Sequence, residues 1–364
     1  MTHRIINFNP GPAGLPLQAL QRVQAELLDY RGSGLSIMEA SHRGKDYDAV
    51  HSEAQALFQR LFGMPDDFKV LLLQGGASLQ FAMVPMNFLA PDQSADYVNT
   101  GEWATKAIKE AKLFGKVRIA GSSEPIHFSA LPALASLDLD PDARYCHITT
   151  NNTIFGTQYP TYPDTGEVPL VCDMSSDILS RRIDWTHIGL VYAGAQKNLG
   201  PSGLTVVALR ESFYQKAKTT GVPTMLAYRT HWEKDSLFNT PPTFAVYIFK
   251  TVLEWVDSIG GLAAVEQRNR DKAALVYGTI DANPDFFRGT VTDPASRSQM
   301  NATFRLPTED LEKQFVAEAL KAGFLGLKGH RSVGGIRVSM YNAVSPEQVQ
   351  EFVGFMETFA RTHG

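Results

Sequence analysis

The feature that most constrains the fold is a series of short apolar runs separated by stretches with helical spacing. Residues 70–73 read Val-Leu-Leu-Leu, and similar runs recur through the first two-thirds of the chain. Such runs are typical of strands covered on both faces, with the intervening helices as the cover. We expect strands at 70–73, 97–98, 117–119, 145–148, 168–172, 189–192 and 204–209. The pattern therefore predicts an α/β protein built on a mostly parallel sheet.

The pattern changes in the last third of the chain. Two long helical stretches, 243–258 and 261–282, lead into a segment that mixes strands with helices. A length of 364 residues allows about two domains. We expect an irregular N-terminal arm at 1–15, a large domain at 16–260 and a smaller α+β domain at 261–364.

Charge and cysteine content exclude several classes of protein. The chain has 34 Lys and Arg against 38 Asp and Glu, a net charge of −4, which argues against a broadly basic nucleic-acid-binding surface. No apolar run approaches the roughly 20 residues of a membrane span, and the N-terminus lacks the apolar stretch of a secretory signal. Cys146 and Cys172 are too few for a disulfide framework or a Cys-rich metal site. We therefore expect a cytoplasmic protein without a metal, and no nucleic-acid or membrane partner.

The strongest candidate for chemistry is the turn at 192–203, which reads Tyr-Ala-Gly-Ala-Gln-Lys-Asn-Leu-Gly-Pro-Ser-Gly. It places Lys197 after an apolar strand, among small residues that allow a planar ligand to approach. Asp173 ends the preceding apolar run and faces the crevice where open α/β sheets bind ligands. An amine and a carboxylate at neighbouring strand ends suit pyridoxal phosphate (PLP). The amine forms a Schiff base with its aldehyde, and the carboxylate holds a proton on its ring nitrogen. A surface lysine and a helix-capping aspartate remain the alternative interpretation.

A phosphate site is expected where a strand runs into a helix at 74–78, Gln-Gly-Gly-Ala-Ser. Backbone N–H groups at such a helix N-terminus attract an anion, although a plain turn is the alternative. Trp103 opens the next helix, where an indole either stacks on a ligand ring or fills the core.

Two His-Arg pairs point to an anionic substrate. They stand at 42–43 and 330–331, in Gly-containing polar loops, and the second is followed by Arg337. Arginine forms two parallel hydrogen bonds with a carboxylate or a phosphate. Unless they are ordinary surface arginines, they predict a small substrate with more than one anionic group.

Together these segments resemble the phosphoserine aminotransferases, class-V PLP enzymes of fold type I. The resemblance covers essentially the whole chain, and its most specific stretches are 38–45, 192–203, 238–244 and 328–341. It implies amino transfer between L-glutamate and 3-phosphohydroxypyruvate, giving O-phospho-L-serine and 2-oxoglutarate in serine biosynthesis. It leaves open a second reaction, on the 4-phosphohydroxy-L-threonine of pyridoxine biosynthesis.

The resemblance also implies a role for each candidate residue. Lys197 looks like the Schiff-base lysine, and Asp173 like the partner of the ring nitrogen. The other implied cofactor-binding residues are Gly76, Ala77, Ser78, Trp103, Thr153, Gln196, Asn239 and Thr240. Asn239 and Thr240 match residues that reach the cofactor phosphate of the other subunit, which implies a homodimer with shared active sites. The implied substrate-binding residues are His42, Arg43, His330 and Arg331 for the distal anion, and Arg337 for the α-carboxylate.

One departure from the family concerns the loop at 75–80, where some members carry an arginine that helps bind the substrate's phosphate. Here the loop reads Gly-Gly-Ala-Ser-Leu-Gln, so that contact is missing. Two alternatives stay open. One is another class-V enzyme, such as an alanine–glyoxylate aminotransferase or a cysteine desulfurase, although Cys146 and Cys172 fall in predicted buried strands. The other is an inactive PLP fold that acts as a binding protein.

Overall fold

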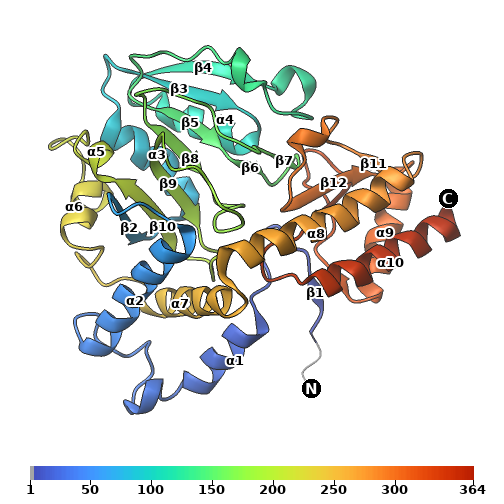
Figure 1. Cartoon of the computed structure of the whole chain (residues 1–364), viewed down its shortest axis with the longest axis horizontal. Helices are drawn as coiled ribbons and strands as arrows, with labels where there is room; N and C mark the ends of the chain where they lie inside the picture. The colour runs from blue at the N-terminus through green and yellow to red at the C-terminus, as the bar shows by residue number, and fades with distance from the viewer. Residues whose placement is uncertain (1–3) are drawn as a thin grey trace.

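The computed structural model describes residues 4–364, and its centre is a sheet of strands in the order β2-β10-β9-β8-β5-β3-β4 (Figure 1). The strands are β2 (Phe68–Leu73), β3 (Ser94–Asn99), β4 (Lys116–Ser122), β5 (Cys146–Thr149), β8 (Leu170–Asp173), β9 (Ile188–Gly194) and β10 (Thr205–Arg210). Neighbouring strands from β9 to β4 are parallel, whereas β10 is antiparallel to both β2 and β9. The mostly parallel sheet that the apolar runs predict is confirmed.

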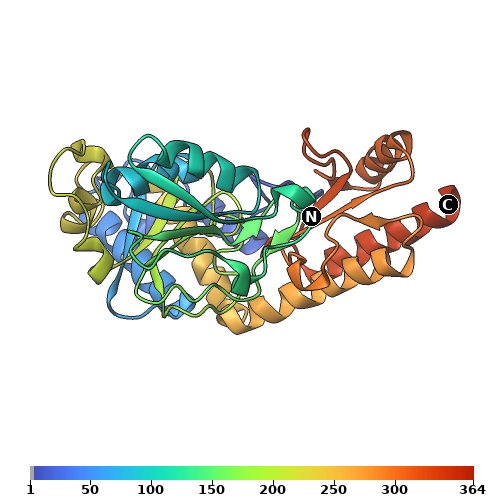
Figure 2. The same cartoon turned by 90° about the horizontal axis from the view of Figure 1, so that it is seen from above.

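Alternation along the strands sends apolar side chains to two covering layers. In β10, Val206 and Ala208 join one hydrophobic core, whereas Val207 and Leu209 join the other. The helices α2 (Lys45–Phe62) and α7 (Thr243–Ser258) cover the first face, and α3 (Gly76–Phe88) and α4 (Glu102–Ala111) cover the second (Figure 2). Burial on both faces explains why the runs in β2, β9 and β10 are almost wholly apolar, whereas β4 at the edge of the sheet is partly exposed and contains Arg118.

A third core lies in the C-terminal part of the chain, at the right of Figure 1. It is enclosed by α8 (Gly261–Ala282), α9 (Glu309–Lys321), α10 (Pro346–His363) and an antiparallel sheet of β11 (Arg288–Gly289), β12 (Asn301–Arg305) and β14 (Ile336–Ser339). The start of α8 packs on the first core through Leu262 and Val265. The domain boundary at 260/261 stays a prediction.

The N-terminal arm differs from the irregular segment that the sequence suggests. β1 (Ile6–Asn7) pairs in parallel with β13 (Phe324–Leu325), and Phe8 is buried against Phe324 and Phe352. The N–H of Ala13 then donates to the carbonyl of Gln196 at 2.9 Å. A strand of two residues is too short to leave a periodic pattern, so the sequence alone does not predict it.

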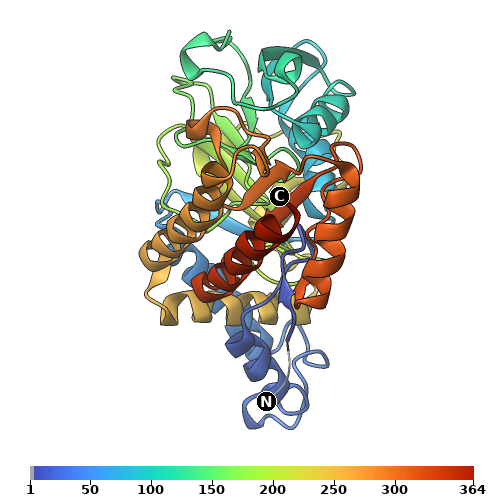
Figure 3. The ribbon, with the colours of Figure 1, turned by 90° about the vertical axis from the view of Figure 1, so that its right-hand side faces the viewer.

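The helix α1 (Leu17–Glu26) and the segment 27–44 extend past α7 at the bottom of Figure 3. We call the segment 27–44 the extension; together with α1 it exposes several large apolar side chains: Leu17, Leu28, Leu35 and Met38. The shorter elements elsewhere are β6 (Asn151–Asn152), β7 (Thr157–Gln158), α5 (Glu211–Tyr214) and α6 (Tyr228–Glu233). Single 3-10 turns lie at Tyr30–Gly32, Glu124–Ile126, Leu134–Ser136, Thr224–Leu226 and Pro294–Ser296. From residue 4 to residue 364, no helix is both long and apolar enough to cross a membrane.

Replacing Phe315 by alanine should destabilise the C-terminal core. Its ring on α9 is fully buried and packs against Phe287, Phe304, Phe352, Phe355 and Phe359. We expect the free energy of unfolding, measured by urea denaturation followed by circular dichroism, to fall by about 3–5 kcal/mol. The matched control is Leu320→Ala on the same helix, where the side chain is 50% exposed and the loss should be about 0.5 kcal/mol or less. Equal losses in the two variants would contradict this packing.

Candidate active site

A cavity of about 350 Å³ opens at the carboxyl ends of β5 and β8 and at the N-termini of α3 and α4. This is the edge of an open α/β sheet at which ligands bind. The cavity brings together ten of the predicted site residues: Gly76, Ala77, Ser78, Trp103, Thr153, Asp173, Gln196, Lys197, His330 and Arg337. His330 and Arg337 come from the C-terminal part of the chain, so the cavity lies between the large sheet and that part.

Lys197 lies on the turn after β9, and its Nζ donates a hydrogen bond to Thr153 Oγ1 at 2.8 Å. Burial lowers the pKa of Lys197 to about 8; the charge of Asp173 opposes this shift and that of Arg337 adds to it. The arm closes over the lysine stem, because a Cβ on Gly11 would lie 3.2 Å from Lys197 Cγ. With a φ of +135°, this position favours glycine. Near neutral pH the amine is therefore much closer to its nucleophilic, uncharged form than an ordinary lysine.

Asp173 ends β8 and is 4% exposed. Its Oδ1 accepts a hydrogen bond from the N–H of Ser175 at 3.0 Å. Burial raises the pKa of Asp173 above its usual value, while the hydrogen bonds from Ser175 and the charge of Lys197 act in the opposite direction. A second positive N–H in the cavity would stabilise the carboxylate, which is what a protonated pyridine nitrogen provides.

The N-terminus of α3 lines one end of the cavity. The N–H of Gly76, however, donates to Thr205 Oγ1 at 2.7 Å. The next two N–H groups, of Ala77 and Ser78, begin the helix and have no acceptor within it. They are therefore the groups that are placed to bind a phosphate. Nothing in the sequence indicates a role for Thr205, because a threonine at the start of a strand has no distinctive pattern.

Trp103 contributes a flat aromatic wall. Lys106 Nζ lies 4.5 Å from the centroid of the indole ring. The indole Nε1 is buried and has no hydrogen-bond partner among residues 4–364. A buried donor of this kind is costly unless a ligand or water accepts from it, so the cavity suits a ligand with acceptor atoms beside its ring.

Arg337 on β14 places a positive charge deep in the cavity. Arg337 is only 5% exposed, and its Nε is buried without a hydrogen-bond partner in the described part of the chain. Burial lowers the pKa of Arg337, and no carboxylate in the described residues forms an ion pair with it. A buried guanidinium without a counter-charge is costly, which favours an anionic ligand at this point.

The loop before β14 carries His330 into the cavity and is held from behind. Glu312 on α9 accepts from Arg305 Nε at 2.5 Å and from the N–H of Gly335 at 3.2 Å. Arg305 also donates to the carbonyl of Val333 at 3.1 Å. Neither Arg305 nor Glu312 was predicted, because their pairing depends on the antiparallel sheet and not on a motif.

Five predicted residues do not line this cavity: His42, Arg43, Asn239, Thr240 and Arg331. Arg43, Thr240 and Arg331 are exposed. His42 Nε2 is buried without a hydrogen-bond partner in the described chain. Within one copy of the chain, the cavity therefore contains eight of the ten expected cofactor-binding residues, without Asn239 and Thr240, and two of the five expected substrate-binding residues, His330 and Arg337.

Comparison with known proteins assigns the class. The family model described as aminotransferase class-V matches residues 5–352. The chain is thus a class-V aminotransferase, an enzyme that transfers amino groups with PLP.

Individual relatives narrow the assignment. The phosphoserine aminotransferase of Lysinibacillus sphaericus is 55% identical over 363 residues, which cover 100% of both chains. The solved phosphoserine aminotransferase from Bacillus circulans subsp. alkalophilus superposes with a TM-score of 0.97, at 55% identity and 100% coverage of both chains. The PLP-bound phosphoserine aminotransferase from Trichomonas vaginalis gives a TM-score of 0.91 at 37% identity, with 97% of this chain and 100% of that chain covered. The chain belongs to the phosphoserine aminotransferase family.

Family membership excludes the alternatives of a desulfurase and of an alanine–glyoxylate aminotransferase. The structure also argues against a desulfurase, because Cys146 and Cys172 are both buried and burial raises the pKa of each thiol. A thiol of this kind is a poor nucleophile.

The pH dependence of cofactor attachment should report the pKa of Lys197. In protein freed of PLP, the rate at which added PLP attaches covalently should rise with pH through a midpoint near 8, since only the uncharged amine attacks. Arg337→Gln should move the midpoint upward and Asp173→Asn downward, because Arg337 lowers and Asp173 raises this pKa. Absorbance measured over time across the pH range provides the rates. A midpoint at the ordinary lysine value of 10.5 would refute the assignment.

Proposed function

We propose that this chain catalyses amino transfer between L-glutamate and 3-phosphohydroxypyruvate, giving O-phospho-L-serine and 2-oxoglutarate. The observation that carries the proposal is the buried, unpaired guanidinium of Arg337 in the same cavity as the Lys197 amine. A carboxylate that binds Arg337 brings the neighbouring Cα of an amino or keto acid toward that amine. Relatives of the same length that bear this enzyme name support the choice of substrates.

The residues that line the cavity have separate roles in the proposed reaction. Bound PLP supplies a ring that accepts the electrons released when a bond at the substrate's Cα breaks. Lys197 would hold the cofactor through its amine, and the same amine, once freed, would move a proton between the substrate's Cα and the cofactor's C4′ carbon. Asp173 holds a proton on the ring nitrogen, and Thr153 lies beside the amine as a hydrogen-bond partner. The N–H groups of Ala77 and Ser78 bind the cofactor's phosphate.

Both substrate pairs carry a second anion beyond the α-carboxylate, so one cationic group serves glutamate and the phosphorylated acid alike. His330 lines the cavity and Arg331 follows it on the same loop. Burial and the cations Arg337 and Arg331 lower the pKa of His330, and a bound anion would raise it again. The reaction of pyridoxine biosynthesis stays a prediction, since its substrate also carries a phosphate.

We further propose a homodimer in which each subunit completes the partner's site. His42, Arg43, Asn239 and Thr240 lie outside the cavity of their own chain, although the family resemblance assigns all four to ligand binding. The extension that carries His42 and Arg43 leaves Leu28 86% exposed, which suits burial against a second copy. The two unpaired cysteines fit the reducing environment of the cytoplasm.

Substrate preference tests the proposed reaction. We expect kcat/KM for 3-phosphohydroxypyruvate to exceed that for unphosphorylated hydroxypyruvate by about 10²-fold or more, because the phosphate pairs with fixed cations. Arg331→Gln should remove most of this preference and leave turnover of hydroxypyruvate almost unchanged. Arg361→Gln, an exposed arginine on α10, is the matched control. Equal kcat/KM values for the two acids in the wild-type enzyme would refute the proposal.

Loss of the Lys197 amine should abolish turnover. In Lys197→Ala, we expect the absorbance of the covalently bound cofactor at about 410 nm to disappear, because the attachment point is lost. We also expect kcat to fall by several orders of magnitude, because the variant lacks the base. Absorption spectra and single-turnover assays with glutamate measure the two effects. Full turnover by this variant would show that another residue is the base.

A further inference from the structure

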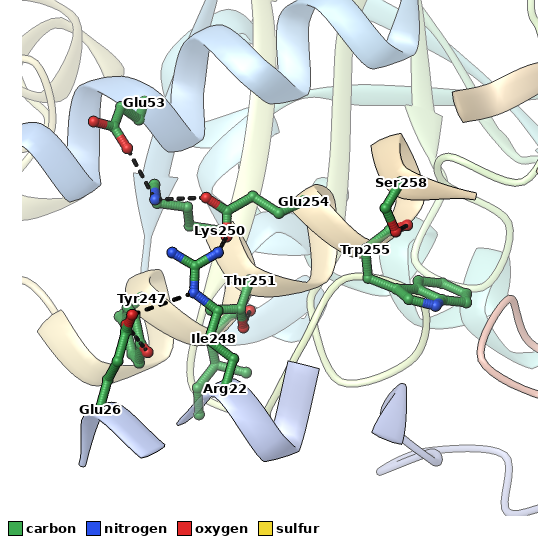
Figure 4. Close-up of polar contacts among 10 residues, drawn as sticks. All are labelled: Arg22, Glu26, Glu53, Tyr247, Ile248, Lys250, Thr251, Glu254, Trp255 and Ser258. Carbon is green, nitrogen blue, oxygen red and sulfur yellow. Dashed lines mark hydrogen bonds and ion pairs between the residues drawn. The ribbon is translucent and has the colours of Figure 1, made fainter. Parts of the chain in front are cut away.

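Outside the active site, five charged side chains of alternating sign and one tyrosine join α1, α2 and α7 (Figure 4). We call it the ion chain, and its members are Glu53, Lys250, Glu254, Arg22, Glu26 and Tyr247. Lys250 Nζ lies 2.9 Å from Glu53 Oε2 and 2.7 Å from Glu254 Oε1. The other carboxylate oxygen of Glu254 accepts from Arg22 Nη1 at 2.5 Å.

The remaining links return to α7. Arg22 Nε lies 3.5 Å from Glu26 Oε1, and Glu26 Oε2 accepts from the hydroxyl of Tyr247 at 2.6 Å. Tyr247 in turn packs edge-on against Tyr30, with ring centroids 5.6 Å apart. Residues of α7 thus contact α1 and the start of the extension at several points.

Burial makes this arrangement specific. The Lys250 side chain is only 1% exposed, so its ammonium requires both carboxylates at their observed positions. Arg22 and Glu254 are 34% and 28% exposed, which places their pair at the border with solvent. Removing Arg22 therefore disturbs the position of α1 without leaving a deeply buried charge unpaired.

The helix α1 has little else to fix its position. Its buried residues are Ala19 and Val23, two small side chains in a helix of ten residues. Apolar burial of this size favours contact with α7 but specifies position weakly, whereas charge-assisted hydrogen bonds specify it strongly.

The ion chain fixes both ends of the extension at 27–44. The N-terminal end follows α1, which Arg22 and Glu26 tie to α7. The C-terminal end leads into α2, where Glu53 binds Lys250 of α7. His42 and Arg43 stand just before α2, so their positions depend on both attachments.

We propose that the ion chain positions His42 and Arg43 for the active site of the partner subunit, with Arg22 as a positioning residue for the substrate's distal anion. This proposal rests on the proposed function and on its homodimer. Because Lys197 and Asp173 lie elsewhere, disturbing the ion chain affects binding of the phosphorylated substrate and leaves the proton transfer intact.

Mixed dimers with one working site test the proposal. Two differently tagged chains are co-expressed and purified through both tags, and one of them carries Lys197→Ala. When Arg22→Met is on the Lys197→Ala chain, the working site receives a disturbed extension, and KM for 3-phosphohydroxypyruvate should rise about fivefold to tenfold with kcat within about twofold. When Arg22→Met is on the working chain, KM should stay at the value of the unaltered mixed dimer. Arg22→Lys on the Lys197→Ala chain should restore most of the affinity.

A control variant separates positioning from general stability. Arg60 also joins α2 to α7, through Asp257 at 2.9 and 3.0 Å, but it lies at an exposed site far along both helices from the extension. Arg60→Met on either chain should leave KM unchanged. Equal KM values for the two placements of Arg22→Met would overturn the positioning role alone. An unaltered mixed dimer that is inactive with the phosphorylated acid would instead overturn the proposed function, and the positioning role with it.

Discussion

The structure depends on the burial of two charged groups, Lys197 and Asp173, at the ends of neighbouring strands. Asp173 and Lys197 stabilise each other only in part, and Arg337 adds a further positive charge to the same cavity. Burying such groups is unfavourable unless the surrounding chain holds them rigidly and a ligand completes the charge balance. The sheet, the N-terminal arm and the C-terminal core all contribute walls to that enclosure.

The relative placement of Lys197 and Arg337 depends on neutral amides rather than ion pairs. Asn151 donates to the Asn301 side chain at 2.8 Å, and the N–H of Asn342 donates to the Asn198 side chain at 3.0 Å. Both contacts join the large-sheet part of the chain to the C-terminal part. Because amide hydrogen bonds are directional and carry no net charge, they fix geometry without altering the potential that an anionic substrate meets. This explains how the Arg337 guanidinium and the Lys197 amine, which come from different parts of the chain, keep a fixed spacing.

The sequence predicts those features that depend on local pattern. Apolar runs locate the strands of the large sheet because both faces are buried, and the small residues around Lys197 mark the turn that a planar cofactor needs. Contacts between distant segments leave no such pattern. The hydrogen bond from Gly76 to Thr205 and the pair of Arg305 with Glu312 arise only when the sheets have formed. The residues that we propose for the partner's site, His42, Arg43, Asn239 and Thr240, are still harder to predict from the sequence, because a single chain does not bring them to its own cavity.

The pairing of β1 with β13 has a consequence for the order in which the enzyme is made. Ile6 leaves the ribosome long before its strand partner, Phe324, is synthesised. The hydroxyl of Tyr341, which holds the carbonyl of Pro10 at 2.8 Å beside the cavity, follows later still. A nascent chain can complete its central sheet before β1 and Pro10 have these partners, so the arm beside Lys197 gains both contacts only once residues 324 and 341 have been synthesised. The Lys197 amine therefore reaches its final environment only after the C-terminal core, which carries Arg337, has folded.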